Sequence, residues 1–136
     1  MSHETVKVLC VDDDPYVINI LQRFLSKGRF EVLTAGSAER GVELFKQCAP
    51  VQIVIADFSL PSMTSSGFLR FVKQSSPETL SILMSSRAAP PDRAPALDED
   101  LIFRRLSKPW ARSELKQVIG AALEQIAVEP GARLRI

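Results

Sequence analysis

The chain has 136 residues, of which 46% are hydrophobic and 24% are charged, the composition of one ordinary globular domain. The formal net charge of +1 excludes a strong overall attraction to nucleic acid or to an anionic membrane. No apolar stretch approaches the ~20 residues that a membrane-spanning helix needs, and the N-terminus lacks a signal-peptide pattern. Neither Cys10 nor Cys48 belongs to a CxxC motif, so reduced thiols and a cytoplasmic location are predicted.

Strand and helix patterns alternate through the first half of the chain. A strand is predicted over 6–11, and Pro15 then opens a helix that stops at Gly28. A second strand over 30–35 leads to Ser37, the expected N-cap of a second helix. This order is typical of an α/β fold.

The third strand, 51–57, is apolar until it ends on a carboxylate. A loop over 58–67 precedes a third helix, which begins at Phe68 and ends near 75–77. Another strand is predicted over 80–84. The chain therefore continues the same alternation past its midpoint.

The last third of the chain is less regular at first. Prolines at 90, 91 and 95 oppose a helix interior, so at most a short helix is predicted around 94–98. A strand over 101–106 follows, and the final helix has a continuous apolar stripe. The stripe consists of Leu115, Val118, Ile119, Ala122, Leu123 and Ile126.

Hydrophilic groups follow four of the five predicted strands. These groups are Asp12 and Asp13, then Asp57, Ser85 and Lys108. Alternating strands and helices predict a doubly wound parallel sheet, in which functional groups gather beyond the C-terminal strand ends. The five residues are therefore expected to meet at one edge of the sheet.

A cluster of Asp12, Asp13 and Asp57 cannot stay an uncompensated group of anions. Two unit charges within about 4–6 Å repel by roughly 3–4 kcal/mol at an effective dielectric near 20. Three such pairs approach the ~5–15 kcal/mol stability of a whole domain, so the site must bind a cation or a proton. Carboxylate oxygens without accompanying His or Cys ligands favour Mg²⁺ or Mn²⁺ over zinc.

A divalent cation, the Lys108 ammonium and the Ser85 hydroxyl together form a receptor for a phosphoryl group. Asp57 stands alone at the end of its strand, so it is the predicted nucleophile that accepts the group as an acyl phosphate. Ser86 competes with Ser85 for the hydroxyl role, and Arg87 lies close enough in sequence to tune hydrolysis.

Four motifs resemble the receiver domain of two-component response regulators: Val11-Asp12-Asp13-Asp14-Pro15, Ala56-Asp57-Phe58-Ser59-Leu60-Pro61, Ser85 and Ser107-Lys108-Pro109-Trp110. The resemblance covers 5–127 and leaves 128–136 as a tail or the start of a linker. It implies a flavodoxin-like (βα)5 fold with strand order 2-1-3-4-5, here with a shortened or irregular fourth helix.

The resemblance also implies a role for each site residue. Asp13 resembles the direct metal ligand, and Asp12 the ligand that acts mainly through water. Asp57 would be both the phosphoryl acceptor and a metal ligand, and the main-chain carbonyl of Ser59 would be the remaining metal ligand from the protein. One phosphoryl oxygen would bond to Ser85 and another to Lys108.

The implied phosphoryl donor is a phospho-histidine of a sensor histidine kinase or phosphotransfer protein. The other candidate partners are an output domain or effector protein, and a second copy of the chain in a homodimer. The domain itself is expected to make no direct contact with nucleic acid or a membrane. On this interpretation the chain is not an enzyme, because it catalyses only its own aspartyl phosphorylation and dephosphorylation.

Some positions depart from the family pattern. The position three before the lysine, often an aromatic switch, is Arg105, and Phe103 would reach the same face by strand alternation. The loop after Pro61 is longer than usual, and prolines interrupt the fourth helix. These departures predict an active site with an altered readout.

Two other functions stay open at this point. A degenerate receiver would bind partners without phosphorylation, and Arg105 favours it while the complete acidic set opposes it. A metal-dependent phosphohydrolase commonly has a second acid two residues after its nucleophile, where this chain has Ser59. A dinucleotide-binding enzyme is disfavoured because no G-x-G-x-x-G follows the first strand.

Overall fold

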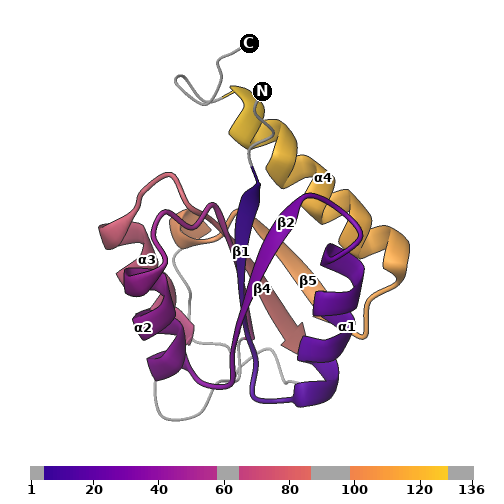
Figure 1. The fold of residues 1–136 in the computed structure, drawn as a ribbon, viewed down its shortest axis with the longest axis horizontal. Helices are drawn as coiled ribbons and strands as arrows, with labels where there is room; N and C mark the ends of the chain where they lie inside the picture. Colours follow the sequence, from indigo (N-terminus) through magenta and orange to yellow (C-terminus); the bar gives the residue numbers. More distant parts are fainter. Residues whose placement is uncertain (1–4, 58–64, 87–98, 129–136) are drawn as a thin grey trace.

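Five parallel strands form one sheet in the order β2-β1-β3-β4-β5 (Figure 1). The computed structural model describes residues 5–57, 65–86 and 99–128. The strands are β1 Val6–Val11, β2 Phe30–Ala35, β3 Ile53–Asp57, β4 Leu80–Ser86 and β5 Arg104–Lys108. The predicted doubly wound α/β fold and its 2-1-3-4-5 order are confirmed.

Helices cover both faces of this sheet. They are α1 Pro15–Leu25, α2 Ala38–Gln47, α3 Ser65–Ser75, α4 Arg112–Val128 and the short 3-10 helix η2 Glu99–Leu101. Figure 1 shows α2 and α3 on one face and α1 and α4 on the other. The predicted short helix around 94–98 lies outside the described residues, so α4 here is the helix that follows the fifth strand.

Side-chain caps fix where the first two helices begin. Asp14 is the N-cap of α1, and its Oδ1 accepts a hydrogen bond from the backbone N–H of Tyr16 at 2.9 Å. The oxygen of Ser37, the predicted N-cap of α2, accepts the backbone N–H of Arg40 at 3.1 Å. Each cap lies within three residues of the end of a strand, so each helix starts at the C-terminal edge of the sheet.

The core consists of two apolar layers, one on each face of the sheet. Phe68 is fully buried in the layer beneath α2 and α3. A methyl group added to Gly41 would lie 3.1 Å from both the Phe68 ring and Val11, so glycine permits this close approach of α2 to the sheet. The opposite layer, beneath α1 and α4, includes Leu21 and Ile119.

Every residue of β3 is buried, as expected of a central strand covered on both faces. Because its strand neighbours are β1 and β4, the carboxylate at the end of β3 lies in the middle of the sheet edge. This position is where the strand order reverses in a doubly wound fold.

Several predicted boundaries need correction. The last strand spans Arg104–Lys108 rather than 101–106, because Leu101 ends η2 and residues 102–103 are irregular. The third helix begins at Ser65, three residues before the predicted start, and α1 ends at Leu25. The apolar pattern located each element, but it missed the polar ends of β5 and α3 and extended α1 past its last apolar residue.

The expected face of Phe103 also needs correction. Phe103 precedes β5, and it packs against the apolar layer that contains Leu106 and α4. Alternation within β5 places Arg105 and Leu106 on opposite faces of the strand. Phe103 therefore does not share the face of Arg105, because the regular strand starts only after it.

Candidate functional site

Three carboxylates meet at the C-terminal edge of the central strands. Val11 of β1 is in register with Ala56 of β3, so Asp12 and Asp57, the next residue along each chain segment, reach the same level. With Asp13 they form a group whose ligand oxygens all lie within 4.8 Å of one another. The predicted convergence of the acidic residues is confirmed in the geometry.

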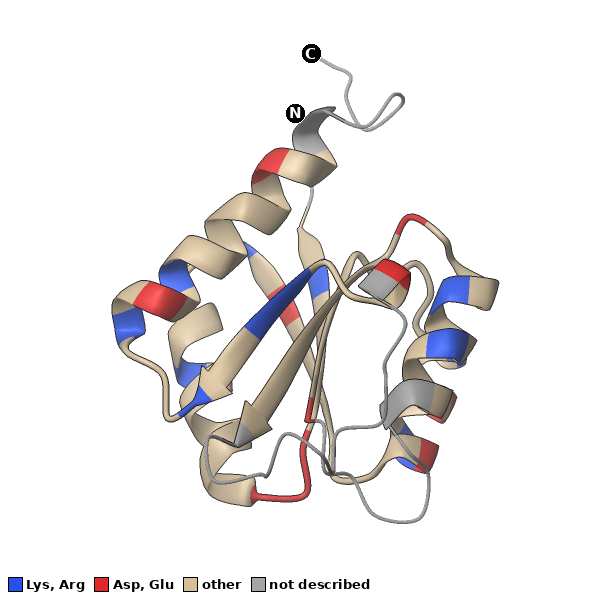
Figure 2. Cartoon of the chain, turned by 180° about the vertical axis from the view of Figure 1, so that it is seen from behind, with Lys and Arg blue, Asp and Glu red and all other residues tan. Residues whose placement is uncertain are grey.

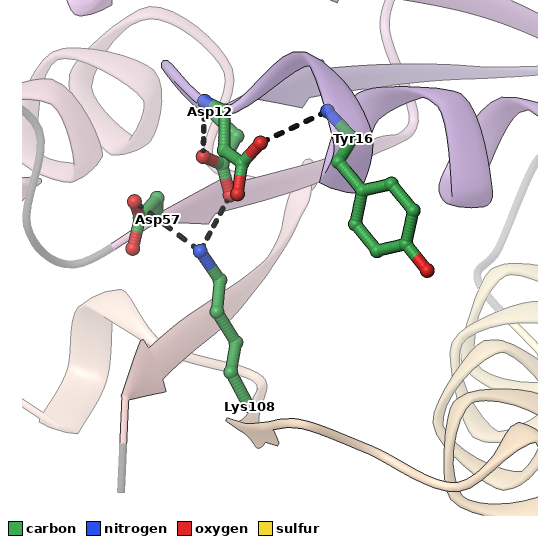
Figure 3. Close-up of polar contacts among 5 residues, drawn as sticks. Asp12, Tyr16, Asp57 and Lys108 are labelled. Carbon is green, nitrogen blue, oxygen red and sulfur yellow. Dashed lines mark hydrogen bonds and ion pairs between the residues drawn. The ribbon is translucent and has the colours of Figure 1, made fainter. Parts of the chain in front are cut away.

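The lysine at the end of β5 reaches into this group. Its Nζ lies 2.7 Å from Asp12 Oδ2 and 3.4 Å from Asp57 Oδ2 (Figure 3). Since β4 separates β5 from β3, only a long side chain can span this gap. In Figure 2 the acidic turn after β1 and the basic tip of β5 lie at the same end of the molecule.

Burial differs sharply among the three acids. Asp12 and Asp57 are 1% and 3% exposed, whereas Asp13 is exposed. A buried carboxylate requires a charged partner or several hydrogen bonds, and Lys108 supplies the charge. Asp13 keeps access to solvent and is therefore the carboxylate that an incoming ion meets first.

Backbone contacts hold Asp12 in one orientation. The backbone N–H of Asp14 donates to Asp12 Oδ1 at 2.9 Å while Lys108 donates to Oδ2 (Figure 3). Asp14 thus supports Asp12 through its backbone and caps α1 through its side chain. The motif pattern did not separate these two tasks of Asp14, although an Asp before Pro at a helix start is a recognisable N-cap signal.

The electrostatics of the site have opposing causes. Burial raises the pKa of Asp12, and the charge of Asp57 raises it further, while hydrogen bonds from Lys108 and Asp14 act against this rise. Burial by itself would lower the pKa of Lys108, but the hydrogen bond to Asp12 and the two nearby carboxylates raise it above its ordinary value. Lys108 is therefore a firmly charged ammonium.

The donor set fits a hard divalent cation. Three carboxylates and one ammonium leave two negative charges uncompensated when all are ionised, which is the charge that one divalent ion neutralises. Every side-chain donor in the group is an oxygen, and Mg²⁺ is held in proteins by one or two carboxylates with water completing its shell. Asp13, the exposed carboxylate of the group, is the one in contact with solvent.

The remaining predicted site residues are placed less completely. Ser85 is half-buried near the end of β4, where it is in register with Ser107 of β5. Ser59 and Arg87 lie outside the described residues. Trp110 is half-buried and packs against the layer beneath α1 and α4.

The peptide bond between Lys108 and Pro109 is cis. This bond joins the residue that contacts Asp12 to the turn leading into α4. The turn places Trp110 directly after the lysine and its proline.

The strand order and the acidic edge together define a flavodoxin-like receiver domain. A sequence profile described as "Response regulator receiver domain" matches residues 8–120. The chain belongs to this family, and it is a receiver domain of response regulators from two-component systems. The family that the four motifs indicated is confirmed.

Individual relatives agree with this assignment. The transcriptional regulatory protein GlrR of Escherichia coli K12 is 30% identical over 99% of this chain, and the hydrogenase transcriptional regulatory protein HoxA of Cupriavidus necator is 31% identical over 91%. The chain spans only 30% and 25% of their lengths. This chain also resembles a crystal structure, that of the signal receiver domain of an HD domain-containing protein from Pseudomonas fluorescens Pf-5. The two structures match with a TM-score of 0.80 and 30% sequence identity, over 89% of this chain and 96% of that one.

Among the described residues, none of the helices has both the length and the apolar character to cross a bilayer. Both cysteines are free, Cys10 buried and Cys48 half-buried. The cytoplasmic location stays a prediction.

The two thiols are expected to differ in reactivity. Burial raises the pKa of the Cys10 thiol to about 12, and the charge of Asp12 adds to the rise, so almost no thiolate forms at neutral pH. A maleimide should therefore modify only Cys48 in the native protein, and both thiols after unfolding in guanidinium, as measured by intact mass. The Cys48→Ala variant should stay unmodified until unfolded. Native labelling of Cys10 at the rate of Cys48 would contradict this expectation.

Proposed function

We propose that Asp57 accepts a phosphoryl group from the phospho-histidine of a sensor histidine kinase or phosphotransfer protein, with Mg²⁺ or Mn²⁺ bound beside it. The observation that carries the proposal is the position of Lys108 Nζ, which contacts both Asp12 and Asp57 where the three carboxylates gather. Such a site combines a nucleophile with positive charge on two sides of an incoming phosphoryl group.

The proposed transfer exchanges one bond to phosphorus for another. A carboxylate oxygen of Asp57 forms the new P–O bond, the P–N bond to the imidazole breaks, and its electron pair stays on the departing nitrogen. The product is an acyl phosphate on Asp57. Asp12 and Asp13 would hold the ion with Asp57 and the Ser59 carbonyl, and the ion would neutralise charge on the phosphoryl oxygens when bound.

The unequal contacts of Lys108 support Asp57 as the acceptor. The contact with Asp12 is short at 2.7 Å, whereas the contact with Asp57 is longer at 3.4 Å. Lys108 can therefore turn toward a phosphoryl oxygen while it keeps its bond to Asp12. Ser85, near the end of the neighbouring strand, would donate its hydroxyl to another phosphoryl oxygen.

Phosphorylation would add about −1.5 to −2 charges at the sheet edge and shift the equilibrium between two conformations of the domain. We propose that an output domain or effector protein reads this change. The names of GlrR and HoxA describe transcriptional regulators, and the chain matches only a part of each. That the output of this receiver is transcriptional regulation is therefore part of the proposal.

The proposal is tested with a small phosphodonor such as acetyl phosphate. The wild-type chain should gain the mass of one phosphoryl group with Mg²⁺ present and stay unmodified in EDTA. Beryllofluoride with Mg²⁺ should also change the fluorescence of Trp110, because this residue follows Lys108 and Pro109 directly. A chain that shows neither change with Mg²⁺ would instead be a receiver that binds partners without phosphorylation.

A further inference from the structure

Two adjoining hollows lie between α1 and α4, on the face away from α2 and α3. The first has a volume of about 460 Å³ and the second about 540 Å³. Phe24, Lys27 and Arg112 line both hollows, so the two form one continuous surface, called here the α1–α4 groove. The groove extends along α4 from Arg112 to Leu123, roughly 16 Å at the helical rise per residue.

The floor of the second hollow is apolar and open. Leu123 is 37% exposed, and the rings of Phe24 and Phe30 are half-buried along the groove. A methyl group added to Gly120 would meet no neighbouring atom within 4 Å, so there is free space above this turn of α4. An apolar floor with space above it can accept a further apolar element.

Exposed cations accompany this floor. Arg23 lies in the last turn of α1 and Lys27 in the turn that follows it, and Arg112 and Lys116 lie one turn apart on α4. None of the described residues that line the two hollows is acidic. In the described part of the chain, no carboxylate forms an ion pair with any of the four cations.

We propose that the α1–α4 groove binds an acidic amphipathic helix of a partner protein. The apolar positions one turn apart, Ile119 and Leu123 on α4 with Ile20 and Phe24 on α1, match the i and i+4 spacing of an apolar stripe on a third helix. Acidic residues beside that stripe would meet the four cations. This site uses no group of the acidic cluster, so it can be tested on the unphosphorylated chain and its failure leaves the proposed function untouched.

Charge disfavours two other occupants of the groove. A second copy packed symmetrically through the same face would bring the four cations against their own images, a like-charge contact. The chain's own residues 129–136 contain Arg133 and Arg135 but only one acid, Glu129, so their charge does not complement the groove.

The test is a selection from a displayed library of helical peptides on the unphosphorylated chain, with ¹⁵N NMR mapping of the enriched peptides. We expect the enriched peptides to carry Asp or Glu beside an apolar stripe and to shift the amide signals of Phe24, Ile119, Gly120 and Leu123. The double variant Arg112→Glu/Lys116→Glu should bind them at least about tenfold more weakly, and added salt should weaken wild-type binding.

Matched variants separate charge from shape. Arg104→Glu reverses an exposed cation on β5, away from the groove, and should leave binding unchanged. Gly120→Leu should block the floor, with the fold checked by its NMR spectrum. Four results would each overturn the proposal. The first two are enriched peptides without acidic bias and amide shifts outside the groove. The other two are self-association through this face in ultracentrifugation and binding to phosphatidylglycerol vesicles in place of peptides.

Discussion

Replacing Asp57 by Asn is expected to abolish phosphoryl incorporation from acetyl phosphate and Mg²⁺. The amide has nearly the shape of the carboxylate but no negative charge, so it is not a nucleophile toward phosphorus. Because Asp57 is 3% exposed at the end of a fully buried strand, a substitution that conserves its volume keeps the core packed. Intact mass before and after treatment measures the result, and the NMR spectrum shows whether the fold is retained.

Asp14→Asn is the matched control for the acceptor. Asn is as good an N-cap as Asp, and the backbone N–H that donates to Asp12 remains. This variant should still gain one phosphoryl group, although it also loses the charge next to Asp13 of the cluster. Full modification of Asp57→Asn, or complete loss of modification in Asp14→Asn, would contradict Asp57 as the acceptor.

The sequence predicted the features that depend on strand ends and helical periodicity. Asp12, Asp57 and Lys108 each follow or end an apolar run, and parallel strands bring such ends to one edge. The strand order came from the family resemblance, since periodicity alone does not say which strands are neighbours. The two helix starts were predictable because Pro15 and Ser37 are strong local start signals.

What the sequence could not give depends on contacts between distant residues. Nothing local says that Lys108 binds Asp12 at 2.7 Å and Asp57 at 3.4 Å, because this difference results from how β5 is spaced from β1 and β3. The face of Phe103 was missed since strand alternation was applied to a residue that precedes the strand. The α1–α4 groove was likewise invisible, because its lining comes from two helices far apart in the chain.

Removing the charge of Lys108 is expected to destabilise the metal-free protein substantially. Lys108→Met keeps a long apolar side chain but leaves Asp12 and Asp57 buried without their ammonium. Breaking a buried ion pair from one side typically costs ~3–5 kcal/mol, and the partial exposure of Lys108 places the expected loss near the lower value, about 3 kcal/mol. Urea unfolding in EDTA measures the loss, and the exposed Lys116→Met on α4 should change the free energy of unfolding by less than about 0.5 kcal/mol.

Magnesium should restore much of the stability that Lys108→Met loses. Without the ammonium, the three carboxylates carry one more uncompensated charge, so the variant should bind Mg²⁺ more tightly than the wild type. Both proteins gain stability from the ion, and a hundredfold tighter binding by the variant would narrow the gap between the two saturated proteins by about 2.7 kcal/mol, which is enough to offset most of the loss. Unfolding curves across a Mg²⁺ titration should therefore converge for the two proteins. Equal destabilisation in EDTA and in saturating Mg²⁺ would mean that the ion and Lys108 do not act on the same carboxylates.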